Sequence, residues 1–412
     1  MIKTSTRNYW LLSGALFAFF LTWSFAFSLF PIWLNRIVGL SGEQTGVIFS
    51  INAIAALAVM PLYGYLQDRL QLRKNLLYTV GFFLLASGPF FIFIYAPLLK
   101  SQFYLGVTLG AFYFALAFSS GVGALETYID RCSRLTGFEF GKARMWGSLG
   151  WASATFFAGS LININPDINF WMASASAVIF CIAVLLVQAP KSVEEKLESQ
   201  RKVQIHDAFS LLRLPTFWAF ATYVMGVTCV YSVYDQQFPV YFASLFSNVD
   251  EGTSMFGYLN SLQVLLEAGG MFLAPLIVNR IGAKNGLLLA GVIMVIRILG
   301  SGIASDPISI SIIKLLHAAE LPIMLVAIFK YIARNFDSRL SATLYLVGFQ
   351  FSTQVAASGL SVIAGIMYDR IGFTNAYFIL GTVAAIFLAI SAVALRNDTK
   401  AEFRTTVSPD CA

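Results

Sequence analysis

Eight ionisable side chains fall inside, or at the ends of, apolar stretches that are long enough to cross a membrane. A charged group at the centre of a bilayer costs about 2.5–3.5 kcal/mol on insertion scales, and it usually marks a functional site. These residues are therefore the first candidates for chemistry: Glu126, Arg144, Asp235, Glu267, Arg297, Lys314, His317 and Glu320.

Three of the eight share one short segment. Lys314, His317 and Glu320 stand at i, i+3 and i+6, which places them within about a 120° arc of one helix. A histidine changes its charge near neutral pH, so next to a carboxylate it suits a proton-coupling site. A histidine on an apolar face is more often a packed core residue, but Glu320 and a facing Arg297 favour function. Asp235 and Lys314 fit an ion pair that locks two helices equally well.

A second group has the chemistry of a sugar site. Glu126 and Arg144 flank a turn near 136–137 at similar distances, so both side chains should reach a similar depth. Trp151 follows Arg144 by seven residues and lies on the same helical face. The charged groups would form strong hydrogen bonds to hydroxyl groups, and the indole would offer an apolar face. Packing or membrane anchoring is the alternative role for Trp151.

The balance of buried charge points to a protonated acid. Three cations, Arg144, Arg297 and Lys314, face four acids, which are Glu126, Asp235, Glu267 and Glu320. An acid that is buried without a cation prefers its neutral form. We expect this acid to be Glu320, beside His317.

The elements that position these residues are membrane-spanning helices. The chain has 412 residues, 58% hydrophobic and 12% charged, against roughly 25% charged in a soluble domain. The apolar stretches do not alternate in polarity as β-barrel strands do, and the first is too long for a signal peptide. An all-α membrane protein with twelve transmembrane helices is predicted, with spans at 10–34, 46–66, 76–98, 104–126, 145–163, 168–188, 216–245, 256–278, 286–304, 308–333, 341–367 and 374–394.

The net charge of +6 follows membrane topology rather than nucleic-acid binding. Only three of the 27 Lys and Arg residues, Arg36, Lys100 and Arg370, fall on the side opposite the termini, and Arg297 and Lys314 lie within spans. By the positive-inside rule both termini are cytoplasmic. The four cysteines, Cys132, Cys181, Cys229 and Cys411, show no metal spacing, so no metal is expected. No cofactor is expected either, and the segment with His317 and Glu320 favours the proton as coupling ion.

The spans divide into two pseudo-symmetric bundles of six. A charged stretch at 191–213 separates an N-terminal bundle, 1–190, from a C-terminal bundle, 214–396, which a tail at 397–412 follows. The segment after the second span, with Gly64, Asp68 and Arg69, is repeated after the eighth: at an offset of 211 residues Arg69 meets Arg280. Such half-repeats place the substrate at their interface, near the middle of the bilayer.

The Gly64-x-x-x-Asp68-Arg69 segment resembles the loop signature of the major facilitator superfamily. Four segments resemble its oligosaccharide:proton symporters, the lactose permease group: 138–151, 235–238, 279–282 and 314–322. The resemblance implies sugar contacts at Glu126, Arg144 and Trp151. It implies a proton-coupling network, with Glu320 as the proton carrier, at Tyr231, Asp235, Arg297, Lys314, His317 and Glu320.

Three positions depart from the lactose-transporting members. Ser232 and Thr353 replace an intramembrane aspartate and its lysine partner, and Val264 replaces a sugar-binding glutamate. The segment with Asn260, Gln263 and Glu267 is similar instead to sucrose-transporting members, although Trp151 is nearer the galactoside members. Glu267 has two open roles, sugar binding or pairing with Arg297.

The resemblance therefore predicts a multi-pass sugar:proton symporter of a bacterial inner membrane, and not an enzyme. The predicted substrate is a disaccharide, and the residues favour sucrose. A galactoside or raffinose-type oligosaccharide is the alternative substrate. An exporter of the same fold and a membrane sugar sensor are the alternative classes. A sensor is disfavoured because no cytoplasmic segment is long enough for an output domain. Sugar, proton and lipid bilayer are the expected partners of a monomeric protein.

Overall fold

The computed structural model describes residues 2–70, 72–188, 213–336 and 344–397. Within these ranges every regular element is a helix. The α-helices are α1 (Ile2–Phe27), α2 (Phe30–Trp33), α3 (Gly42–Leu70), α4 (Asn75–Leu85), α5 (Ser87–Pro89), α6 (Ala96–Ser101), α7 (Phe103–Phe114), α8 (Ser120–Thr136), α9 (Phe140–Ile164), α10 (Pro166–Leu186), α12 (Pro215–Tyr223), α13 (Cys229–Ser244), α14 (Val249–Ile281), α15 (Ala283–Ile303), α16 (Pro307–Leu315), α17 (His317–Asn335) and α19 (Ser352–Ala394).

Several spans contain a wider, π-helical turn that the apolar pattern did not indicate. These segments are Leu34–Val38, Phe90–Tyr95, Ala115–Ser119, Val224–Thr228 and Tyr345–Phe351. Such turns occur as local bulges within longer helices and often near functional sites. Two of them connect α7 to α8 and α12 to α13, so that each pair forms one span.

The predicted spans agree with the helices. Within the described ranges nine helices are long and apolar enough to cross a membrane, and the bent pair Asn75–Leu85 and Ser87–Ser101 makes a tenth. Helix α9 has the length of a span but carries Lys142 and Arg144 in its first turns. Helix α19 holds two spans, because Gly372 adopts a φ of 78° and breaks it. Together these helices supply the twelve predicted stretches, apart from residues 341–343, which lie outside the described ranges.

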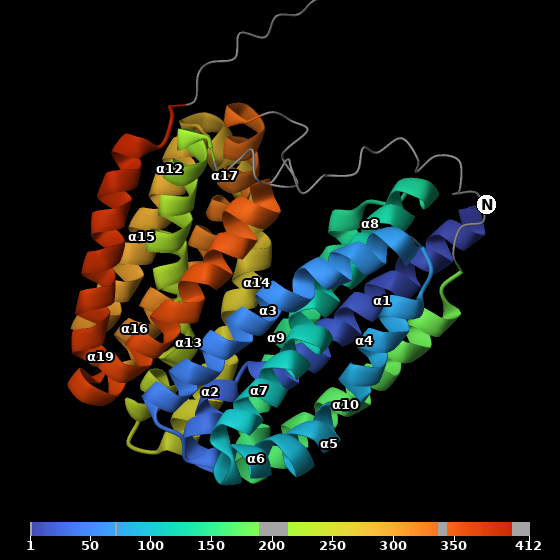
Figure 1. Cartoon of the computed structure of the whole chain (residues 1–412), viewed down its shortest axis with the longest axis horizontal. Coiled ribbons are helices and arrows are strands. Elements are labelled where there is room, and N and C mark those ends of the chain that lie inside the picture. The colour runs from blue at the N-terminus through green and yellow to red at the C-terminus, as the bar shows by residue number, and fades with distance from the viewer. Residues whose placement is uncertain (1, 71, 189–212, 337–343, 398–412) are drawn as a thin grey trace, which may run out of the picture.

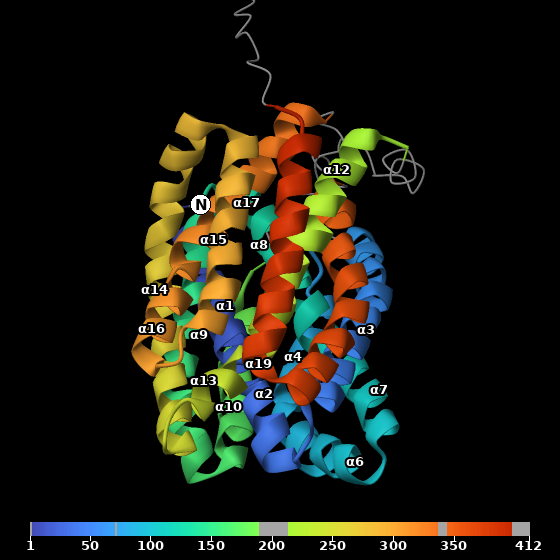
Figure 2. The same ribbon diagram turned by 90° about the vertical axis from the view of Figure 1, so that its left-hand side faces the viewer.

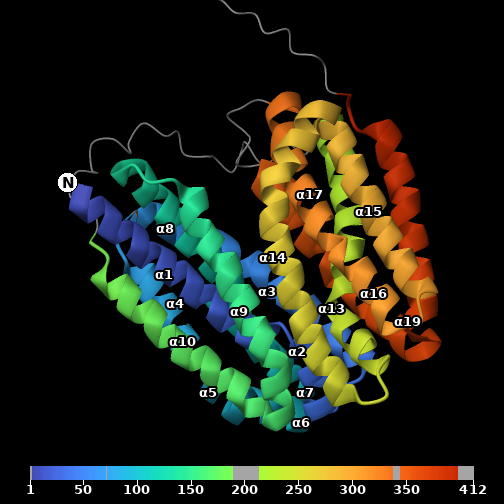
Figure 3. The same ribbon diagram turned by 180° about the vertical axis from the view of Figure 1, so that it is seen from behind.

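The helices form two groups that diverge toward one end of the molecule (Figure 1). Helices α1 to α10 form one group, and α12 to α19 form the other, which stands in front in Figure 2. The predicted linker, 191–213, and tail, 397–412, lie almost entirely outside the described residues. The two groups meet at the opposite end, where α3 packs on α19 and α9 packs on α14 (Figure 3).

Glycines bring the backbones of the two groups close together at this closed end. A Cβ atom on Gly257 of α14 would lie 2.7 Å from the carbonyl oxygen of Thr155 on α9. One on Gly159 would lie 2.6 Å from the oxygen of Thr253. No side chain fits at such separations, so glycine allows the contact.

Carboxylate side chains also link the two groups of helices at the closed end. Asp369 of α19 accepts hydrogen bonds from the backbone N–H groups of Gly42 (2.8 Å) and Glu43 (2.7 Å), at the start of α3. A carboxylate is favourable there because the N-terminus of a helix carries a partial positive charge. Arg36 forms an ion pair with Asp250 of the other group at 2.5 Å.

We expect Asp369→Ala to raise the population of conformations that are open at this end by about tenfold or more, because charged hydrogen bonds contribute about 1.5–3 kcal/mol each. The measure is the alkylation rate of a cysteine at Thr45, which is 2% exposed, in a chain without other cysteines. Asp369→Glu keeps the charge and should change the rate less. Equal rates in the alanine variant and the parent would contradict the prediction.

Candidate functional site

A cavity of about 550 Å³ lies between the two groups of helices. Side chains from α1, α3 and α9 line one side, and side chains from α13 to α17 and α19 line the other. Nine of the predicted site residues line it: Arg144, Trp151, Tyr231, Asp235, Asn260, Gln263, Glu267, Lys314 and His317. The structure thus brings both predicted groups to one cavity.

The first wall combines a carboxylate, a guanidinium and aromatic rings. Glu126 of α8 and Arg144 of α9 meet at 2.5 Å, between a carboxylate oxygen and Nε of Arg144, which confirms the similar depth expected of them. Arg144 lies over the ring of Phe20, with its Cζ atom 4.3 Å from the centroid. Trp151 lines the same cavity and meets Trp23 edge to face, 5.7 Å between centroids.

Since Nε of Arg144 contacts Glu126, its terminal amino groups remain for further hydrogen bonds. Both side chains are about one-third exposed. This wall can hold hydroxyl groups through charged donors and acceptors, and it can pack a ring on indole and phenyl faces.

Helix α14 forms the facing wall with amide and apolar side chains. Asn260, Gln263, Val264 and Glu267 all line the cavity. The Oε1 atom of Gln263 is buried and has no hydrogen-bond partner among the described residues. A buried acceptor without a partner is costly, so it is available to a donor from a bound molecule.

Behind the cavity lies a buried charged network around Arg297 of α15. Arg297 and Glu320 have no exposed side-chain surface and pair at 2.7 Å. Arg297 also donates to the hydroxyl of Tyr231. Asp235 pairs with Lys314 at 2.8 Å and lies 3.9 Å from Arg297, so the ion pair expected for Asp235 and Lys314 is confirmed.

His317 joins this network to the cavity. Its Nδ1 atom lies 2.8 Å from Oε1 of Glu320 and 2.7 Å from the hydroxyl of Tyr231. A hydrogen bond between Nδ1 and a carboxylate oxygen needs one proton, held either by the imidazole or by the acid. The pair can therefore store a proton in two forms that differ only in which atom carries it.

Of the two roles left open for Glu267, this conformation does not show the pairing with Arg297. The carboxylate of Glu267 lies 4.0 Å from Nε2 of His317, on the cavity side of that ring. Arg297 is occupied by Glu320, which reaches it from α17 in the protein interior.

The expectation that Glu320 is the acid without a cation is wrong. In this conformation Arg144, Arg297 and Lys314 pair with Glu126, Glu320 and Asp235. Among the described residues Glu267 is the intramembrane acid that forms no ion pair with an arginine or a lysine, and its contact is with His317 at 4.0 Å. The charge count was correct, but the sequence did not fix the partners.

Lys314, His317 and Glu320 do not belong to one uninterrupted helix. Helix α16 ends at Leu315 and α17 begins at His317, with Leu316 between them in a near-helical conformation. The break is small, so all three side chains still reach the same network.

The predicted loop residues lie apart from this site. Gly64 and Arg69 belong to the last two turns of α3, as does Asp68, whose side chain lies outside the described residues. The matching Arg280 lies in the last turn of α14. The repeat therefore falls at equivalent helix ends in the two groups, which agrees with the internal symmetry that the sequence indicated.

Sequence reasoning missed the apolar part of the cavity. Phe20, Phe49, Phe256 and Met294 line it, but no pattern separates them from the other apolar residues of their spans. An aromatic ring in the cavity differs from one that faces lipid only in how its helix is oriented in the folded structure.

A charged and aromatic cavity between two groups of membrane-length helices defines a membrane transporter. A solved structure of the nucleoside transporter NupG has the same fold, with a TM-score of 0.77 over 95% of this chain and 99% of that chain at 14% identity. The model of the LacY proton/sugar symporter family matches residues 1–407.

Relatives that are about 40% identical over most of the chain are sugar permeases. The chain is 42% identical to the raffinose permease of Escherichia coli and 43% identical to the melibiose permease of Enterobacter cloacae subsp. cloacae, each over 95% of this chain and 93% of the relative. It is 39% identical to the sucrose permease of Escherichia coli over 90% of both chains.

The chain therefore belongs to the LacY family of proton/sugar symporters, with the twelve-helix major facilitator fold. It is a multi-pass membrane transporter and not an enzyme.

Proposed function

We propose that the chain imports a disaccharide of the sucrose type together with a proton, by exposing the cavity alternately to the two sides of the membrane. The observation that carries the choice of sugar is the cavity face of α14, where Asn260 and Gln263 present amides and Val264 presents an apolar side chain. Galactoside-transporting members have a glutamate at the position of Val264. The valine offers no charged hydrogen bond to a galactosyl hydroxyl group.

Two further neutral positions support this proposal. Ser232 and Thr353 both line the cavity, where lactose-transporting members carry an aspartate and a lysine. Hydroxyl groups donate and accept hydrogen bonds without charge. In this arrangement Glu126, Arg144 and Trp151 hold one ring, and the amides of α14 contact the other.

The proton is bound at the network behind the cavity. Glu320 carries it, His317 transmits its state to the cavity side, and Arg297 stabilises the ionised form of the carboxylate. Tyr231, Asp235 and Lys314 keep Arg297 and His317 in place through the contacts described above. In this proposal the chain lies in a bacterial inner membrane and both of its termini face the cytoplasm, because Lys and Arg are concentrated on the side of the termini.

Competition for uptake tests the sugar. Excess unlabelled sucrose should block the uptake of labelled sucrose at concentrations about 10- to 150-fold lower than lactose or melibiose, because a lost charged hydrogen bond costs about 1.5–3 kcal/mol. Alkalinisation of the medium on adding sucrose would report proton entry. Stronger inhibition by lactose or melibiose would overturn the sucrose assignment and leave sugar:proton symport.

Val264→Glu is the matched variant. It places a carboxylate on the cavity face of α14, so inhibition by melibiose should become stronger while inhibition by sucrose becomes weaker. Unchanged preference in this variant would show that α14 does not select the sugar.

A further inference from the structure

Helices α3 and α19 pack directly on each other from the closed end toward the main cavity. A Cβ atom on Gly46 of α3 would overlap the carbonyl oxygen of Ser361 on α19, so the two backbones touch there. One turn further in, the hydroxyl of Ser50 donates a hydrogen bond to the carbonyl oxygen of Ser358. Contacts as close as these leave no room for water, so this part of the boundary between the two groups is dry.

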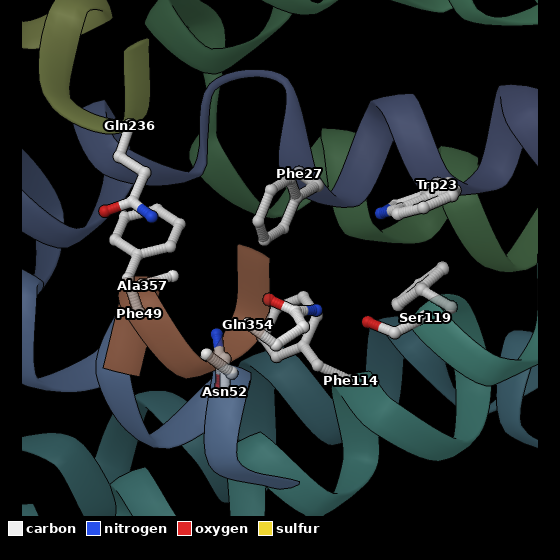
Figure 4. A pocket seen from close by; sticks show the side chains of 11 residues that line it. Trp23, Phe27, Phe49, Asn52, Phe114, Ser119, Gln236, Gln354 and Ala357 are labelled. Carbon is white, nitrogen blue, oxygen red and sulfur yellow. The ribbon is translucent and has the colours of Figure 1, made fainter. Parts of the chain in front are cut away.

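The dry contact ends at a second, smaller cavity of about 140 Å³, which we call the seam pocket. The first group of helices supplies Asn52 and Ser119 to its wall, and the second supplies Gln236 and Gln354 (Figure 4). Gln236 also lines the main cavity. The seam pocket therefore lies between the two groups, where the dry contact of α3 and α19 gives way to the main cavity.

The lining of the seam pocket has the properties of a water site. None of the side chains that line it is ionisable, and its amides and hydroxyl group can both donate and accept hydrogen bonds. The Oδ1 atom of Asn52 is buried and has no hydrogen-bond partner among the described residues. One water takes roughly 30 Å³ of liquid volume, so a cavity of about 140 Å³ has room for about four. Buried water is expected where space and two or more polar partners coincide.

We propose that the seam pocket holds ordered water that bridges the two groups, and that this hydrated seam makes the closed end easier to open. Opening at this end must separate α3 from α19. Separating an apolar contact exposes apolar surface to water and is costly, whereas amides that are already hydrated lose little when they separate. The inference concerns the opening of the closed end and does not depend on which sugar is carried.

Radiolytic labelling tests for the water. Phe114 lines the seam pocket and is 4% exposed, whereas Phe170 is 3% exposed and lines neither cavity. Hydroxyl radicals formed from bound water by a brief X-ray pulse should oxidise Phe114 several times faster than Phe170. Asn52→Leu should lower the labelling of Phe114 to the level of Phe170. Equal labelling of the two rings in the parent would show that the pocket is dry and would overturn the proposal.

The alkylation rate of a cysteine at Thr45, which is 2% exposed, tests the effect on opening. Asn52→Leu and Gln354→Met replace an amide, one in each group, by an apolar side chain of similar size. Each variant extends the dry contact, so the rate should fall about 5- to 20-fold, because an apolar side chain must then be exposed on opening. An unchanged or faster rate in both variants would overturn the link between the water and opening.

Asn169→Leu is the matched control. Asn169 of α10 is 3% exposed and its Oδ1 atom also lacks a hydrogen-bond partner among the described residues, but its Nδ2 atom donates to the oxygen of Ala158 on α9, 3.0 Å away and in the same group. This variant should leave the alkylation rate unchanged. A fall as large as that in Asn52→Leu would assign the effect to a general change in packing and overturn the proposal. None of these measurements uses a sugar, so their failure would leave the proposed substrate standing.

Discussion

Replacing Glu320 with glutamine should abolish uphill sugar accumulation while leaving exchange of sugar between equal pools. Glu320 has no exposed surface, and its carboxylate contacts both Arg297 and His317. A group there must lose its proton on one side of the membrane for each transport cycle to accumulate sugar. Glutamine mimics the protonated acid and cannot lose a proton, so the carrier binds and exchanges sugar but gains nothing from a pH gradient.

Two measurements on vesicles separate these activities. Accumulation of labelled sugar under an imposed pH gradient should fall to the equilibrium level, and efflux into medium with equal unlabelled sugar should stay within about threefold of the parent. Removing one partner of a buried ion pair can cost about 3–5 kcal/mol, so the amount of folded protein is measured first. Retained accumulation in Glu320→Gln would show that another acid carries the proton.

Glu267→Gln is the control that the geometry supplies. Glu267 also lies next to His317, but it faces the cavity and has no cation partner among the described residues. If Glu320 is the carrier, accumulation should persist in Glu267→Gln. Loss of accumulation in this variant alone would assign proton transport to Glu267.

The spans and the first wall of the cavity could be predicted because each depends on local pattern. An apolar stretch of about 20 residues specifies a span wherever it packs. The depth of Glu126 and Arg144 follows from counting residues on either side of one turn, and the two side chains meet at 2.5 Å. Trp151 lies on the face of Arg144 because seven residues make two helical turns.

The partners of the other buried charges could not be predicted, because they depend on how separate helices face each other. The intramembrane acids outnumber the cations by one. The sequence argument took the unpaired acid to be Glu320, but Glu320 pairs with Arg297 of α15, and Glu267 is the acid that has no such partner among the described residues.

The seam pocket, a cavity of about 140 Å³ whose wall includes polar side chains from separate spans, could not be predicted for the same reason. Asn52, Ser119 and Gln354 are far apart in the sequence. Each is uncharged, so its free-energy cost within a span is too small to mark a functional site.

Arg144→Lys should remove nearly all sugar binding, although the positive charge is kept. Nε of Arg144 holds Glu126 at 2.5 Å, the guanidinium lies over Phe20, and the side chain lines the cavity. A guanidinium offers a planar set of donors that can contact the acid and two sugar hydroxyls at once, whereas an ammonium group is a single point of charge.

The loss of two charged hydrogen bonds, at about 1.5–3 kcal/mol each, predicts affinity about 100-fold lower or worse. Binding of labelled sugar to purified protein is the measure, because it separates affinity from transport. Arg134→Lys is the matched control: Arg134 pairs with Asp130 at 2.8 Å on an exposed face of α8, and affinity there should not change. Near-normal binding by Arg144→Lys would reduce Arg144 to the structural partner of Glu126, since the ammonium group would then suffice to keep that carboxylate paired while the sugar was held by Trp151 and α14.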